Sequence, residues 1–128
     1  MLIINMMGES LYHWKLAIEN RDGARSEFEA KRYSNVGILS IRSLEQAIEA
    51  CAAKKNLHFH EDPRRAHRMR RNWLRSNFPN LSEAWEILWS IYGELGYGGA
   101  DGTRAKLALK TLEATLEVLR RECIESGS

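Results

Sequence analysis

The chain has only two prolines among its 128 residues, so few positions are unable to join a helix. It also has only two cysteines, which allow at most one disulfide. Nowhere do four or more residues alternate between apolar and polar in a β-rich context bounded by turns, which excludes a mainly β fold. No stretch approaches the roughly 18 consecutive apolar residues of a membrane-spanning helix. The formal net charge is only +2, so overall charge does not by itself indicate a nucleic-acid partner. These absences predict a soluble, helical protein without a membrane segment.

The length predicts one domain, residues 1–128, large enough to bury a single core. Residues 1–7 are apolar but lack a basic flank and end at Gly8, so they are too short for a signal peptide and are expected to form a loosely ordered tail. Cys51 and Cys123 both fall on apolar helical stripes, which favours buried free thiols in a reducing cytoplasm. We therefore expect a cytoplasmic protein.

Apolar residues recur at helical spacing along the whole chain, and five helical segments are expected. These span about 9–30, 33–54, 63–77, 80 or 82 to 95, and 101–125. The inner face of the first is expected to carry Leu11, Trp14 and Ile18. Asp62 before Pro63, and Asp101 after a glycine-rich stretch, are typical helix-capping acids. Short loops between long amphipathic helices predict an all-α fold, an up-and-down bundle of four to five helices.

The last two segments carry most of the apolar pattern. In the fifth, apolar residues repeat at alternating spacings of four and three, a heptad seam suited to bundle packing. In the fourth, polar residues occupy only about a third of the helical wheel, so this helix must be covered on more than one side. We expect a homodimer that buries part of this surplus. The expected interface residues are Trp85, Leu88, Trp89 and Tyr92.

Six arginines lie in the stretch "PRRAHRMRRNWLR", residues 63–75. Four of them fall within about 60° of one another on a helical wheel, opposite the apolar residues. These four are Arg64, Arg68, Arg71 and Arg75. Guanidinium groups bind phosphate or carboxylate oxygens two at a time, so a stripe of four can follow a nucleic-acid backbone or hold a nucleotide. The alternative is a solvated face whose charges are offset by acids on neighbouring helices.

Other residue types give little support for catalysis or metal binding. The segment "HFHED" and His67 hold metal-competent side chains, His58, His60, Glu61 and Asp62 among them, but in no established zinc spacing. The glycines near residue 100 match no phosphate-binding loop, and no serine lies in a nucleophile elbow. We therefore predict no metal site and no cofactor, and His67 is the only catalytic candidate.

The stretch "EFEAKRYSNVGILSIRSLEQAIEACAAKKNLHF" resembles the first two helices of HEPN domains, which are small prokaryotic and archaeal helical bundles. The stretch "ELGYGGADGTRAKLALKTLEATLEVL" is similar to their final helix and the loop before it. The resemblance covers most of the chain from Glu27 onward and matches Glu45 to a family glutamate. It implies a dimeric bundle that works beside a minimal nucleotidyltransferase in a toxin–antitoxin-type pair, and many members are metal-independent ribonucleases.

The ribonuclease signature of that family, an arginine followed four to six residues later by histidine, is absent here, and Glu49 stands where many members carry lysine. We therefore expect a non-catalytic or weakly catalytic module that binds a partner protein, a nucleotide or RNA through the arginine stripe. One alternative is a ribonuclease that uses residues outside the signature, such as His67 with a neighbouring arginine. Another is a structural assembly protein whose arginines meet an acidic partner.

Overall fold

The computed structural model describes residues 2–96 and 101–125, and these residues contain five α-helices and no strand. The α-helices are α1 (Leu2–Glu29), α2 (Tyr33–Ala53), α3 (Ala66–Asn77), α4 (Ser82–Gly96) and α5 (Gly102–Leu119). Two 3₁₀ turns, η1 (Phe59–Glu61) and η2 (Pro79–Leu81), flank α3, and a π-helical segment, η3 (Arg120–Glu125), follows α5. The predicted all-α class is confirmed.

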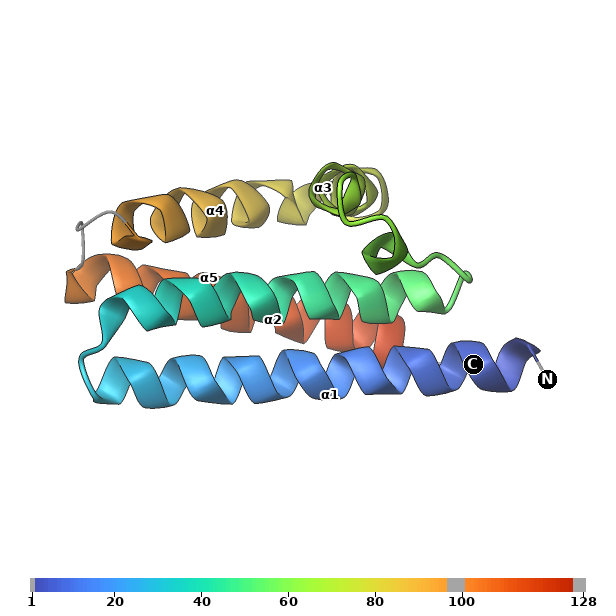
Figure 1. Cartoon of the computed structure of the whole chain (residues 1–128), viewed down its shortest axis with the longest axis horizontal. Helices are drawn as coiled ribbons and strands as arrows, with labels where there is room; N and C mark the ends of the chain where they lie inside the picture. Colours follow the sequence, from blue (N-terminus) through green and yellow to red (C-terminus); the bar gives the residue numbers. More distant parts are fainter. Residues whose placement is uncertain (1, 97–100, 126–128) are drawn as a thin grey trace.

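Four of the helices run in alternating directions, as expected for an up-and-down bundle. Figure 1 shows α1, α2, α4 and α5 along the long axis, whereas α3 is seen nearly end-on at one end of the molecule. The short helix α3 therefore crosses the bundle instead of extending it. This arrangement places one face of α3 against the bundle and leaves the other face toward solvent.

The helix boundaries follow local signals in the sequence. A residue with positive φ follows the end of α1 and of α2, Lys31 and Asn56 respectively. In each case the backbone amides of that residue and of the next one donate to carbonyls of the last helical turn. Asp101 caps α5 by accepting a hydrogen bond from the Arg104 amide. Asp62, by contrast, does not cap α3, because that helix begins only at Ala66 after a turn through residues 63–65.

α1 differs from the sequence prediction in its start and in its buried face. It begins at Leu2 instead of Glu9, so residues 2–7, predicted as a tail, form its first turns, and Met1 lies outside the described residues. Leu11, predicted to face inward, is 58% exposed. The buried side chains of α1 are instead small or polar, namely Ser10, His13, Ala17 and Ala24.

Small residues let α1 approach α2 closely and join it by hydrogen bonds. The Ser10 hydroxyl donates to the Ala50 carbonyl, and the Ser43 hydroxyl of α2 donates to the Ala17 carbonyl, both at 2.7 Å. A hydroxyl bonded to the backbone of the facing helix fixes the register of the pair as well as its spacing. Of the larger side chains expected on this face, Leu11 is exposed, whereas Trp14 and Ile18 are partly buried and Trp14 packs against the main core.

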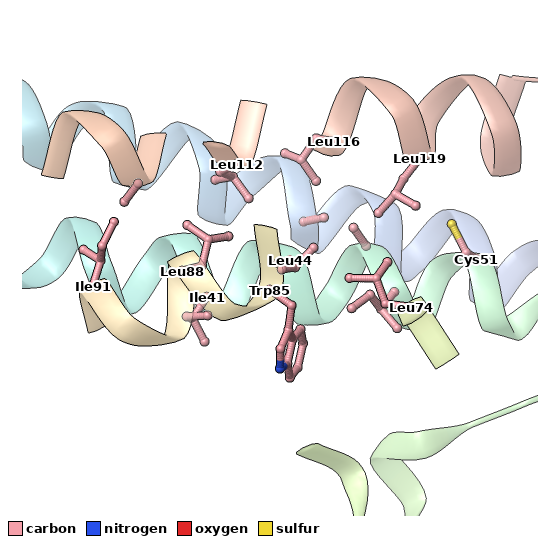
Figure 2. Close-up of a cluster of buried hydrophobic side chains, with 14 of the residues drawn as sticks. Ile41, Leu44, Cys51, Leu74, Trp85, Leu88, Ile91, Leu112, Leu116 and Leu119 are labelled. Atoms are coloured by element: carbon pink, nitrogen blue, oxygen red, sulfur yellow. The ribbon is translucent and has the colours of Figure 1, made fainter. Parts of the chain in front are cut away.

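The main hydrophobic core lies between α2, α4 and α5, with contributions from α1 and α3. Figure 2 shows Ile41 and Leu44 of α2, Leu112 and Leu116 of α5, and the Trp85 side chain of α4 in this cluster. Burial of each large aliphatic side chain stabilises the fold by about 1.5–3 kcal/mol. The predicted heptad seam of α5 is confirmed, since its members in this helix are all buried: Ala105, Leu109, Leu112, Leu116 and Leu119.

Cys51 of α2 and Cys123 of η3 form a disulfide, with their Cα atoms 5.3 Å apart. The prediction of two free thiols is therefore wrong: the seam of α5 continues into η3 and brings Cys123 against the end of α2. Disulfides persist in oxidising compartments, so the reasoning that led from free thiols to a cytoplasmic location loses its basis. Among the described residues, no helix combines the length and the apolar character needed to cross a membrane.

Candidate functional site

The arginines of the α3 region divide into an outer and an inner group. Arg64, Arg68 and Arg75 are exposed, and no carboxylate of residues 2–96 or 101–125 lies within ion-pair distance of them. Arg68 and Arg75 are two helical turns apart on the same side of α3, about 10 Å along its axis. Arg64 lies in the turn before the helix, so the wheel that placed it in the stripe does not describe it.

Arg71, the fourth predicted member of the stripe, is engaged within the chain. Its Nε lies 2.7 Å from Oε1 of Glu86 on α4, and both side chains are about half exposed. This is the offsetting acid that the alternative interpretation expected. The exposed arginines of this region without an ion-pair partner among the described residues are therefore Arg64, Arg68 and Arg75, which we call the outer arginines.

Arg70 forms a buried ion-pair network that the sequence analysis did not anticipate. Its Nε donates to Glu49 Oε2 at 2.7 Å and its Nη1 to Glu45 Oε2 at 3.2 Å, so it bridges two carboxylates of α2. The side chain of Arg70 is 12% exposed, and Glu49 is almost completely buried. This network anchors α3 to α2.

Glu49 also belongs to a cluster with two histidines from different elements. His13 of α1, Glu49 of α2 and His60 of η1 place their potential ligand atoms within 4.8 Å of one another. The rings of His13 and His60 are 5.0 Å apart between centroids. The His60 amide donates to Glu49 Oε1 at 3.3 Å, and His13 Nδ1 lies 2.7 Å from Gln46 Oε1.

Glu45 sits at the edge of this network. Burial raises the pKa of the Glu45 carboxyl above its ordinary value, and attraction to the positive charges of Arg70 and Arg42 opposes this shift only in part. Two carboxylates share the one guanidinium of Arg70, and the negative charge of nearby Glu49 also raises the Glu45 pKa. The network thus holds one acid that ionises less readily than a solvated glutamate.

His67, the catalytic candidate, is exposed and packs against aromatic rings of α4. Its ring lies 4.6 Å from the ring of Trp89, edge to face, and 5.2 Å from that of Trp85. Within the described part of the chain no side chain forms a hydrogen bond to His67. Glu45 is close enough to interact electrostatically with His67 but forms no hydrogen bond to it, so the geometry shows a packing role for this ring.

The residues predicted at a dimer interface mostly lie inside the single chain. Trp85 and Leu88 are each 1% exposed and belong to the main core, so they are not available to a second copy. Trp89 is partly buried, while Tyr92 is 38% exposed. Trp85 and Leu88 are buried within the chain because α4 packs against both α2 and α5, whereas the predicted contact of Trp89 and Tyr92 with a second copy stays a prediction.

Of the loop residues with metal-competent side chains, His58 and His60 have different surroundings. His58 Nε2 bonds to Asn56 Oδ1, and its Nδ1 lies 2.9 Å from Glu9 Oε2 without the alignment of a hydrogen bond. His60 faces His13, which the sequence analysis did not consider. The burial of His13 had a signal in the sequence, because Ser10, His13 and Ala17 are spaced as one helical face; its contact with His60 had none.

Comparisons of the chain with protein-family models, with curated proteins and with solved structures found no match. The resemblance to HEPN domains therefore stays an expectation.

Proposed function

We propose that this helical bundle binds single-stranded RNA through the phosphate backbone, using the outer arginines Arg64, Arg68 and Arg75. The observation that carries the proposal is that these three cations are exposed and unpaired within the described residues, whereas the neighbouring Arg70 and Arg71 are engaged. Arg68 and Arg75 lie on the same side of α3, and Arg64 lies in the turn just before it. Exposed guanidinium groups without a carboxylate partner are suited to binding backbone phosphates. The resemblance to HEPN domains points to the same class of ligand.

Among residues 2–96 and 101–125, no hydrogen bond orients a histidine beside the outer arginines, which favours binding without cleavage. Cleavage of RNA without a metal needs a general acid or base next to a cation. His67 is the nearest candidate along the chain, but its ring packs edge-on against Trp89. The proposal is therefore a binding module and not a ribonuclease.

Gel retardation of a fluorescent single-stranded RNA at several salt concentrations tests the proposal. Three phosphate contacts predict a slope of about −2 in a plot of log K against log salt, since each contact on a single strand contributes about −0.7. Arg68→Glu with Arg75→Glu should weaken binding at every salt concentration and flatten the slope to about −0.7. Arg71→Glu should have a smaller effect because Glu86 already neutralises that side chain.

Lys106→Glu is the matched control, because it reverses the charge of an exposed side chain near the start of α5. This end of α5 lies at the opposite end of the bundle from α3 (Figure 1). Equal weakening by Lys106→Glu and by Arg68→Glu would contradict the proposal, because it would show attraction to the overall charge only. Failure of the unaltered protein to retard RNA at low salt would also contradict it.

The same experiment separates the two alternatives. Loss of intact RNA over time, abolished by His67→Ala, would favour a ribonuclease. An absence of RNA binding combined with Arg68-dependent binding of an acidic protein would favour an assembly protein. The nucleotidyltransferase partner is a prediction from the resemblance alone, and the homodimer is a prediction from the resemblance and from the apolar pattern of α4. Light scattering of the purified chain measures the oligomeric state directly.

A further inference from the structure

We infer that His13, Glu49 and His60 form a binding site for a divalent transition-metal ion of the zinc class. Three separate elements, α1, α2 and η1, bring these side chains together, and their ligand atoms lie within 4.8 Å of one another. Two imidazoles and one glutamate are a common protein ligand set for zinc when a fourth position stays open to water. The inference concerns the inner side of α3 and does not depend on RNA binding by the outer arginines.

The hydrogen bond between His13 and Gln46 prepares His13 as a ligand. The Gln46 Oε1 atom can only accept, so the Nδ1 atom of His13, 2.7 Å away, carries the ring proton. The lone pair of the neutral ring is then on Nε2. Metal-binding histidines almost always donate their other ring N–H to an oxygen acceptor in this way. Because His13 is only 7% exposed, its ring is also held in place by packing.

Glu49 has a similar supporting partner. Arg70 donates to its Oε2 atom and the His60 amide to its Oε1 atom, and a carboxylate has about four lone-pair positions. Room therefore remains for a metal bond after both hydrogen bonds are made. The positive charge of Arg70 is offset by its ion pairs with Glu49 and Glu45, so Arg70 does not leave the site with an uncompensated positive charge.

His60 completes the site from the solvent side. Zinc bonds of about 2.0–2.2 Å bring ligand atoms to within roughly 4 Å of one another. In the structure the three ligand atoms lie within 4.8 Å of one another, so they must move slightly closer together to bind zinc. The exposed ring of His60 can rotate toward the other two, while the buried side chains of His13 and Glu49 stay in place. A ligand set with two buried members and one exposed member leaves the remaining coordination position accessible to water.

A second group, His58, His60 and Glu61, shares His60 but is a poorer candidate. Both ring nitrogens of His58 already lie within 3 Å of oxygen atoms, Asn56 Oδ1 and Glu9 Oε2. His60 and Glu61 are exposed, so no buried side chain positions this group. We therefore assign the site to the buried set.

Isothermal titration calorimetry of the oxidised, full-length chain with Zn²⁺ tests the inference, because the disulfide then leaves neither cysteine as a thiolate ligand. The unaltered protein should bind one Zn²⁺. Gln46→Leu should weaken binding by about 10–100-fold, as expected for loss of an outer-shell partner. His60→Ala should weaken binding further, and it should abolish the visible absorption bands of bound Co²⁺. Because His60 is exposed, this variant should keep its helical circular dichroism.

His67→Ala is the matched control, since it removes an exposed histidine that lies outside the site and should leave Zn²⁺ affinity unchanged. His58→Ala should likewise have little effect. The inference is wrong if the unaltered protein binds no Zn²⁺, or if His60→Ala binds it as tightly. It is also wrong if His58→Ala weakens binding while Gln46→Leu does not, because the exposed loop group would then be the site.

Discussion

Arg68 and Arg70 are two residues apart on α3, but their surroundings are opposite. Arg70 is nearly buried and bridges two glutamates of α2, whereas Arg68 is exposed with no carboxylate partner among the described residues. A helix turns by about 200° over two residues, so adjacent arginines of one basic stretch reach opposite environments. The same residue type thus has two roles: Arg70 anchors α3 to α2, and Arg68 on the opposite face remains available to a ligand.

The largest expected difference between the two faces is in stability. Arg70→Ala leaves Glu45 and Glu49 as buried carboxylates without a counter-charge, which should lower the free energy of unfolding by about 3–5 kcal/mol. Arg68→Ala should change it by no more than about 0.5 kcal/mol. Urea denaturation followed by circular dichroism measures both values. Similar values for the two variants would mean that the inner network does not hold α3 in place.

Coupling energies give a finer comparison between the inner pair Arg70–Glu49 and the outer pair Arg71–Glu86. A double-mutant cycle should give about 1–3 kcal/mol for the inner pair, which solvent hardly reaches. The outer pair is about half exposed and should give roughly 0.2–1 kcal/mol, with a further decrease at high salt. A coupling of the outer pair that equals that of the inner pair would contradict the contrast in burial.

The smallest expected effect concerns Glu45 and depends on pH. Because the pKa of Glu45 is raised in the folded chain, the unfolded state releases this proton at lower pH than the folded state does. The contribution of Glu45 to stability is therefore fully present below its unfolded pKa and is lost as the pH rises through its folded pKa. Stability of Glu45→Gln relative to the unaltered chain should consequently increase between pH 4 and pH 7. Urea denaturation at the two pH values measures this change, and a change in the other direction would show that Arg70 outweighs burial.

Much of the fold could be predicted from the sequence because long helices carry periodic apolar residues. The bounds of α2 and α4, the seam of α5 and the Asp101 cap all follow from spacing and capping rules. The inner face of α1 could not be predicted in this way, since its close contact with α2 requires small residues such as Ser10 and Ala17. An apolar-periodicity argument favours the larger side chains, of which Leu11 is exposed while Trp14 packs, partly buried, against the main core.

The site was harder to predict because its residues are far apart in the sequence. The outer arginines were identified from their spacing, although Arg71 proved to be paired and Arg64 to precede the helix. Arg70 carried a usable signal: it lies four residues from both Ala66 and Leu74, which are the buried residues of α3. The contact of His13 with His60 depends on how α1 passes η1, and no local pattern encodes that.

The covalent link between Cys51 and Cys123 makes a closed ring of the chain between them, and this ring includes α3, α4 and α5. A protease that cuts once inside the ring, for example after an arginine of α3, produces two pieces that stay joined until a reductant is added. A cut in the turn between α1 and α2 lies outside the ring and leaves α1 attached by non-covalent contacts alone. Gel mobility with and without reductant would therefore report on which side of Cys51 the chain was cleaved.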